Sequence, residues 1–263
     1  MLSMLQTQII FPVRKDIWRV PSDPPYHWVY EDVWLDVNGN KTHGWYIPIE
    51  NANGTVLYCH GNGETVASPL ESFEDFRAFG LNGRVIEDGG YGRSEGTPGE
   101  QRGYEDVRSA WRFLVETKGE QDKRIVVYGR SLGAAIAVHL ASEVQPAALI
   151  MESGFTSITD MTKTIVPLLP LGFLVRHRFD SLEKIGNVNA PILIVHSQGD
   201  KLIPFRHGKR LFEAAREPKQ FLEIQGTHDD GWMVSRDFYR PALAAFISRS
   251  LNVDESLPAG DDE

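Results

Sequence analysis

The sequence predicts an α/β fold in which a mostly parallel sheet carries helices on both faces. Short apolar runs recur along the chain and are nearly continuous in Val, Ile and Leu, a pattern typical of parallel strands that are covered on both sides. Helical patterns lie between these runs, and strand–helix alternation at this spacing indicates a parallel sheet with crossover helices. The predicted strands cover Val56–Cys59, Arg84–Glu87, Ile125–Tyr128, Ala148–Met151 and Ile192–His196.

A β-hairpin is predicted ahead of these strands, at residues 33–47, because Asn38-Gly39 separates two β-type segments and Asn-Gly favours a two-residue hairpin turn. A last apolar run, Phe221–Ile224, ends the series. Apolar residues at helical spacing predict the helices, and one of these is apolar nearly all round, as in a buried helix. The predicted helices cover residues 101–117, 131–144 and 206–216.

The segment 155–190 breaks the alternation, because no strand can be placed between Gly154 and Pro191. Within it, Ile165–Val175 is apolar but is interrupted by two prolines, and it is much shorter than the roughly 20 residues needed to cross a bilayer. Two interpretations are open: a buried loop with helical turns, or a small lid over an apolar pocket. Long insertions at the carboxyl ends of strands often form lids, and we expect one here.

Composition bounds the remaining organisation. The chain has 263 residues, 41% of them hydrophobic and 24% charged, and without repeats or linkers we expect one domain over residues 1–251. We expect residues 252–263 to form a disordered acidic tail. Met1–Pro12 has the features of neither a spanning helix nor a signal peptide.

Charge and cysteine content exclude several function classes. The net charge of −9 argues against nucleic acid as a partner and against electrostatic docking on anionic lipid. Cys59 is the single cysteine, so an internal disulfide is excluded and a reducing, cytoplasmic location is expected. The histidines are scattered without metal-ligand spacing, so the sequence implies neither a metal nor another cofactor.

The pentapeptide Gly-Arg-Ser-x-Gly occurs twice, at Gly92–Gly96 and at Gly129–Gly133. G-x-S-x-G is the signature of a serine nucleophile on a sharp strand-to-helix turn. The second copy directly follows the predicted strand that ends at Tyr128 and opens the predicted helix. Its flanking glycines permit a tight turn, and the helix N-terminus directs N–H groups toward an oxyanion. We therefore predict Ser131 as the nucleophile.

The first copy lacks that context. Asp88–Tyr91 separates it from its strand, and Thr97-Pro98-Gly99 follows it, which does not continue as a helix. The residue after its serine is Glu95, whose carboxylate would oppose a developing negative charge. We interpret Gly92–Gly96 as a glycine-rich turn that borders the same rim of the sheet.

A serine nucleophile needs a base and an orienting carboxylate, in the chain order Ser, acid, His for this arrangement. Asp200 is the predicted acid because it follows a buried strand in a tight Gly-Asp turn. The alternative for Asp200 is a cap for the helix that starts near Arg206, and Glu183 and Glu213 are weaker candidates for the acid.

His228 is the predicted base, since it lies in a glycine-bearing loop after the last apolar run. We expect His207 to be solvated, and His139 to be packed in the core. His177 and His196 precede the acid in the chain. Asp229 or Asp230 is expected to cap the helix that follows.

Two backbone N–H groups are predicted to bind the oxyanion, those of Asn62 and Leu132. Asn62 belongs to the loop His60-Gly61-Asn62-Gly63 after the first parallel strand, and Leu132 follows the predicted nucleophile. Gly63 is the alternative donor, and we expect His60 to hold the loop through a hydrogen bond.

Together these residues resemble the α/β-hydrolase superfamily, and within it the small bud-emergence-related branch, which includes membrane-associated serine hydrolases and protein depalmitoylases. The likeness extends from about Ile9 to Leu251 and implies the eight-stranded α/β-hydrolase fold. Its distinctive segments are Ile10–Pro12, His43–Tyr46, His60–Gly63, Gly90–Pro98, Gly129–Gly133, Gly199-Asp200 and Gly226–Asp229.

The chain departs from that branch in three ways. Gly89 stands where the family usually has an Arg before Gly-Tyr-Gly, the usual N-terminal membrane segment is not found, and the cysteine cluster of some depalmitoylases is absent.

The sequence therefore predicts a serine hydrolase that cleaves small-molecule acyl esters or thioesters through Ser131, His228 and Asp200. A peptidase or amidase of the same fold is the alternative enzyme. A non-catalytic binding protein of this fold is the alternative outside enzymes. Peripheral membrane association, oligomeric state and acyl chain length are left open.

Overall fold

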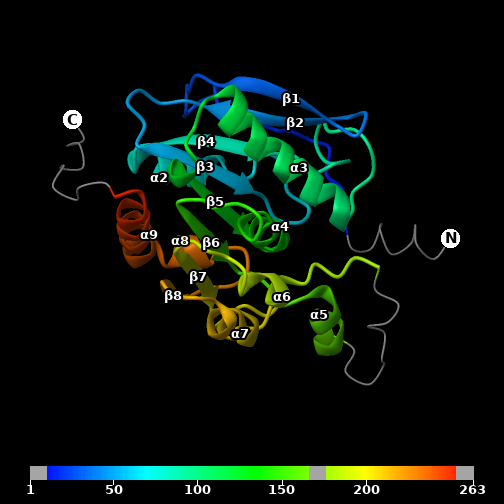
Figure 1. Cartoon of the computed structure of the whole chain (residues 1–263), viewed down its shortest axis with the longest axis vertical. Helices are drawn as coiled ribbons and strands as arrows, with labels where there is room; N and C mark the ends of the chain where they lie inside the picture. The colour runs from blue at the N-terminus through cyan, green and yellow to red at the C-terminus, as the bar shows by residue number, and fades with distance from the viewer. Residues whose placement is uncertain (1–10, 166–175, 253–263) are drawn as a thin grey trace.

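The computed structural model describes residues 11–165 and 176–252. It contains an eight-stranded sheet with the strand order β1-β2-β4-β3-β5-β6-β7-β8 (Figure 1). The pairs β1–β2 and β2–β4 are antiparallel, and every other neighbouring pair is parallel. The predicted mostly parallel, eight-stranded α/β fold is thus confirmed. The strands are β1 (Glu31–Val37), β2 (Asn40–Ile47), β3 (Gly54–Cys59), β4 (Leu81–Ile86), β5 (Ile125–Arg130), β6 (Ala148–Glu152), β7 (Ile192–Ser197) and β8 (Lys219–Ile224).

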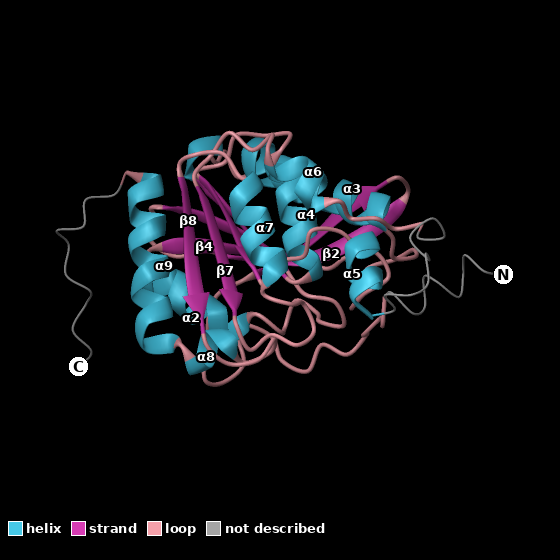
Figure 2. Cartoon of the chain, turned by 90° about the horizontal axis from the view of Figure 1, so that it is seen from below, coloured by secondary structure: helices cyan, strands magenta, loops and turns pink. Residues whose placement is uncertain are grey.

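Helices cover both faces of the sheet, as Figure 2 shows. One apolar cluster joins the sheet to α2 (Leu70–Ala78) and α9 (Arg236–Leu251). The cluster on the opposite face joins it to α3, α4 and α7. Burial on both sides explains why the central strands are apolar along their whole length. The other helices are α3 (Glu100–Arg112), α4 (Leu132–Ala141), α5 (Ile158–Ile165), α6 (Ser181–Ile185), α7 (Arg206–Ala214) and α8 (Gly231–Val234).

The N-terminal hairpin forms as predicted. Val37 of β1 pairs with Asn40 of β2, and the two residues between them have positive φ, 54° at Asn38 and 77° at Gly39. Two positive φ values define the turn type whose twist matches that of the flanking strands.

The predicted helices are also found, with different ends. The helix predicted at 101–117 is α3, followed by a π-helical turn at Phe113–Thr117. The helix predicted at 131–144 is α4, in which every residue is buried. The helix predicted at 206–216 is α7, and Leu211 lies fully buried on its inner face.

The segment 155–190 is described only in part. In residues 155–165 and 176–190 the structure contains α5 and α6 but no strand, as expected. The predicted apolar lid stretch falls almost wholly on residues 166–175, which lie outside the described residues, as do residues 1–10 and the predicted tail from 253 onward. Among the helices of the described ranges, none combines the length and apolarity needed to cross a membrane.

The first turn of α4 packs directly on the end of β3. A side chain at Gly133 would overlap the backbone carbonyl oxygens of Cys59 and His60. Because neither oxygen can move without distorting β3 or the loop after it, glycine is required at this position.

We expect Gly133→Ala to destabilise the protein by about 1–3 kcal/mol, since overpacking against backbone outweighs the better helix propensity of alanine. Gly186→Ala is a matched control, because Gly186 has a helical φ of −66°. A Cβ atom added at Gly186 would lie 3.7 Å from the carbonyl oxygen of Ala214, which is an ordinary contact distance. Thermal melting should therefore separate the two variants. Equal melting temperatures would contradict the packing argument.

Candidate active site

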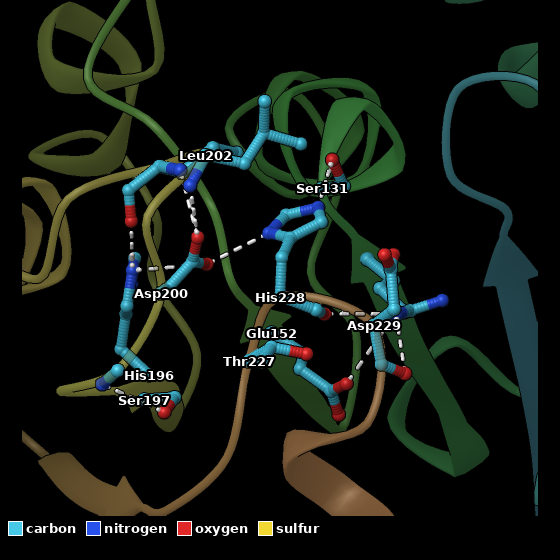
Figure 3. Close-up of polar contacts among 12 residues, drawn as sticks. Ser131, Glu152, His196, Ser197, Asp200, Leu202, Thr227, His228 and Asp229 are labelled. Atoms are coloured by element: carbon cyan, nitrogen blue, oxygen red, sulfur yellow. Dashed lines mark hydrogen bonds and ion pairs between the residues drawn. The ribbon is translucent and has the colours of Figure 1, made fainter.

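Loops at the carboxyl ends of β5, β7 and β8 bring three predicted residues together (Figure 3). Ser131 follows β5, Asp200 lies in the turn after β7, and His228 lies in the loop after β8. The imidazole of His228 lies between the carboxylate of Asp200 and the hydroxyl of Ser131. Parallel strands place these three loops on one edge of the sheet.

Ser131 occupies a strained turn between β5 and α4. Its φ of 54° and ψ of −116° are unusual for a residue with a side chain. Its N–H donates to the carbonyl of Glu152 on the neighbouring strand at 2.9 Å. A side chain at Gly129 would overlap the backbone of Gly133 and Ala134, so the glycines allow the strand end and the helix start to touch. The turn therefore has the geometry of a nucleophile elbow.

The distances within the three residues suit proton transfer. His228 Nε2 lies 3.0 Å from Ser131 Oγ, and His228 Nδ1 lies 2.7 Å from Asp200 Oδ2. When Nδ1–H donates to the carboxylate, the neutral imidazole keeps Nε2 free to accept the serine proton. The arrangement can therefore raise the nucleophilicity of the hydroxyl.

Asp200 is buried, and both of its carboxylate oxygens accept hydrogen bonds. Its Oδ1 accepts hydrogen bonds from the N–H groups of Leu202 at 2.9 Å and Ile203 at 2.8 Å. Burial raises the pKa of Asp200, but the hydrogen bonds from His228 and Ile203 outweigh that effect and leave its pKa below the ordinary range. The cap position of α7 is Phe205, so the helix-cap alternative for Asp200 does not apply.

The expectation that His207 is solvated is wrong. His207 is only 1% exposed, and its Nδ1 lies 2.8 Å from Thr156 Oγ1. The first turn of α7 packs on the loop after β6 instead of facing water. Burial, with nearby Arg206, lowers the pKa of His207 to about 4, so this imidazole is neutral at pH 7.

Two other histidines have structural partners. His139 is stacked on Tyr104, with ring centroids 3.5 Å apart, as expected for a packed histidine. His196 was not singled out by the sequence, yet its Nε2 lies 2.8 Å from the carbonyl oxygen of Ile203 and 3.7 Å from Asp200 Oδ2. It therefore holds the turn that carries Asp200.

The predicted oxyanion donors lie in the loop after β3 and in the first turn of α4. Leu132 is the first residue of α4, so no helical carbonyl precedes it for its N–H to bind. Asn62 is exposed, and its side-chain oxygen accepts from the Tyr91 hydroxyl at 2.6 Å. The N–H of Gly61 is engaged by Glu64 Oε2 at 2.9 Å.

His60 lies under that loop, as expected. Its Nδ1 lies 2.8 Å from the carbonyl oxygen of Gly61, and its Nε2 lies 3.5 Å from the Glu87 carboxylate. Burial lowers the pKa of His60, but Glu87 and Asp88 outweigh this and raise it to about 9. His60 is therefore charged at pH 7 and holds the loop electrostatically.

The first Gly-Arg-Ser-x-Gly copy is a loop fastened to β2. The hydroxyl of Ser94 is buried and accepts from the N–H of His43 at 2.9 Å. Glu95 forms a pair of hydrogen bonds with the backbone of Lys41, each of 2.8 Å. No helix begins in residues 92–99, which agrees with the predicted turn.

Asp229 and Asp230 differ from the expected capping role. Asp230 occupies the cap position of α8, but its side chain makes no capping bond to that helix. Instead, Asp230 Oδ1 accepts from the N–H and hydroxyl of Thr227, which closes the loop around His228. The side chain of Asp229 is 91% exposed.

Within residues 11–165 and 176–252, no group of three or more His, Cys, Asp or Glu side chains is placed to hold a metal ion.

The chain is similar to known proteins in both sequence and structure. Residues 50–179 match the family model described as serine aminopeptidase, S33. An uncharacterized protein of Mycobacterium tuberculosis is 32% identical over 216 residues, covering 81% of this chain and 77% of that one. Human alpha/beta hydrolase domain-containing protein 17B is 32% identical over 213 residues, covering 76% and 68%.

Solved structures share the fold. An esterase from Pyrococcus furiosus superposes with a TM-score of 0.77 at 20% identity, covering 92% of this chain and 99% of the esterase. With the eight-stranded sheet and the serine turn at its carboxyl edge, these similarities show that the chain belongs to the α/β-hydrolase superfamily and is a hydrolase.

Proposed function

We propose that the protein is a serine hydrolase that cleaves acyl esters or thioesters through an acyl-enzyme intermediate. The observation that carries the proposal is the continuous hydrogen-bonded series from Ser131 through His228 to Asp200, with contacts of 3.0 Å and 2.7 Å. The strained serine at a helix N-terminus supports the same role.

In the proposed mechanism, Ser131 Oγ attacks the acyl carbonyl while His228 Nε2 accepts its proton. Asp200 holds the imidazole in the required tautomer and stabilises the imidazolium. The N–H groups of Leu132 and Asn62 bind the oxyanion. His228 then protonates the leaving alcohol or thiol. In the second half, His228 activates water, the acyl-enzyme is hydrolysed, and the carboxylic acid leaves.

Exposed apolar side chains in the segments that carry Asp200 and follow His228 support an acyl substrate. Leu202, in the turn that carries Asp200, is 60% exposed, and Met233 and Val234, which follow His228, are 54% and 58% exposed. Exposed apolar side chains favour an apolar ligand. The esterase name of the Pyrococcus furiosus neighbour points the same way. We place the enzyme in the cytoplasm with a small-molecule substrate.

A peptidase is the second candidate, because the matching family model is described as serine aminopeptidase. Amide and ester hydrolysis share the same acyl-transfer steps, so the site geometry alone suits both. We favour esters, because Leu202, in the turn that carries Asp200, is apolar and 60% exposed and suits an acyl chain better than a charged amine.

The two motif serines provide a matched pair of variants. Ser131→Ala should lower kcat for p-nitrophenyl butyrate by about 10⁴-fold or more. Ser94→Ala should change kcat by less than about threefold, but it leaves the buried N–H of His43 without an acceptor and should cost about 1–3 kcal/mol of stability. Steady-state kinetics measure kcat for each variant, and thermal melting measures the change in stability. Full activity in Ser131→Ala would rule out the proposed nucleophile.

The orienting role of Asp200 predicts a kinetic defect. Asp200→Asn should lower kcat by about 10⁴-fold, because an amide favours the wrong imidazole tautomer. Asp229→Asn is the control: its side chain is 91% exposed, so kcat should change little. If the two variants had similar kcat values, Asp200 would not be the catalytic acid.

Substrate preference separates the two candidate activities. We expect p-nitrophenyl octanoate to be cleaved with a higher kcat/KM than the acetate, because exposed apolar side chains such as Leu202 gain more from burying a longer chain. Matched acyl thioesters and aminoacyl p-nitroanilides complete the panel. Preference for the acetate would contradict the apolar-substrate proposal, and faster cleavage of the anilides would favour the peptidase.

A further inference from the structure

Arg130, the residue before the predicted nucleophile, contacts the backbone of the loop that carries the base. Its Nη2 donates to the carbonyl oxygens of His228 at 2.9 Å and Asp229 at 3.2 Å. Both acceptors are main-chain atoms, so the contact fixes where the loop lies and does not depend on the state of the imidazole. The guanidinium therefore ties the strand that ends in the elbow to the loop after β8.

The same guanidinium reaches the loop of the predicted oxyanion hole. Arg130 Nη1 donates to Glu64 Oε1 at 2.6 Å, and the other oxygen of Glu64 accepts the N–H of Gly61 at 2.9 Å. Gly61 immediately precedes Asn62, whose N–H is the proposed oxyanion donor. Glu64 thus links Arg130 to the backbone at that position.

Arg130 is held on a third side by β6. Its Nε lies 3.4 Å from Glu152 Oε1, and the carbonyl of Glu152 accepts the N–H of Ser131. The arginine side chain is only 13% exposed. Burial lowers the pKa of Arg130, but the carboxylates of Glu64 and Glu152 outweigh this and raise it, so the guanidinium is charged and its hydrogen bonds are charge-assisted.

The arginines of the two motif copies can be compared directly. Arg93 has the same place in the other Gly-Arg-Ser-x-Gly copy, but its side chain is 48% exposed and its ion pair with Asp32 is 3.5 Å long. An exposed ion pair of this kind contributes little to stability. The contacts of Arg130 therefore follow from its position in the fold, since the motif is the same.

We propose that Arg130 is a positioning residue, which fixes the His228 loop and the Asn62 loop relative to Ser131 through one planar guanidinium. This inference rests on the proposed hydrolase mechanism. Arg130 contacts the main-chain carbonyls of the His228 loop, Glu64 and Glu152, so it should govern the alignment of the base and the oxyanion donors. Lysine cannot reproduce the function fully, because a single ammonium lacks the fork that reaches Glu64 and the two carbonyls together.

The test compares Arg130→Met, Arg130→Lys and the control Arg93→Met. We expect Arg130→Met to lower kcat by about 10- to 100-fold, because misalignment of reacting groups by about 1 Å can cost that much. KM should change by less than about threefold, since ground-state binding is retained. Arg130→Lys should have an intermediate kcat, and Arg93→Met should match the wild type.

Glu64→Gln tests the link to the oxyanion loop and does not depend on the folding of Arg130→Met. Glu64→Gln alone should lower kcat by about tenfold. The double variant Glu64→Gln/Arg130→Lys should lower kcat by less than the product of the two single effects, because the two residues act through one contact. All assays are run well below each melting temperature, so that loss of folded protein does not contribute.

The inference is overturned if the Arg130 variants keep wild-type kcat, if kcat and KM change in proportion to lost stability, or if Arg93→Met shows the same loss. Failure of the proposed function is a separate result. In that case the wild type itself would show no hydrolysis that depends on Ser131. The inference alone fails when the wild type shows Ser131-dependent hydrolysis and the Arg130 variants keep its kcat.

Discussion

The close approach between the first turn of α4 and the ends of β3 and β5 is the constraint on which the site depends. The missing side chains of Gly129 and Gly133 allow backbone to touch backbone there. The chain then turns sharply, so Ser131 takes its unusual φ and its hydroxyl lies at the edge of the sheet. The same turn leaves the N–H of Leu132 unbonded by the helix. One packing contact thus positions both the proposed nucleophile and a proposed oxyanion donor.

Buried charges hold the surrounding loops against that turn. Glu152 accepts hydrogen bonds from the hydroxyls of Tyr128 and Tyr239 and also faces Arg130. A buried carboxylate is tolerated when hydrogen bonds and a cation satisfy it. His60 and Glu87 lie 3.5 Å apart as an ion pair beneath the loop after β3. The loops therefore rest on polar contacts whose loss would leave unpaired charges, which favours a single arrangement of the site.

Local sequence was enough to predict the parts of the fold that local chemistry determines. The Asn-Gly hairpin, the continuously apolar strands and the nearly all-apolar α4 each have a pattern that tertiary packing does not alter. By contrast, α2 went unpredicted because only Leu70, Phe73, Asp75 and Phe76 are buried along it, among charged residues. The three site residues could be chosen by chain order and strand context. The burial of His207 and the contacts of Arg130 could not, since both depend on loops that are distant in sequence.

Labelling with a fluorophosphonate, followed by tryptic peptide mapping, tests the central claim most directly, because the reagent reacts with a serine only where a base and oxyanion donors activate it. Trypsin cleaves after Arg93 and Arg130, so the two motif serines fall on separate peptides, Ser94–Arg102 and Ser131–Lys163. We predict one adduct, on Ser131 within Ser131–Lys163. An adduct on Ser94–Arg102, or none on Ser131, would contradict it.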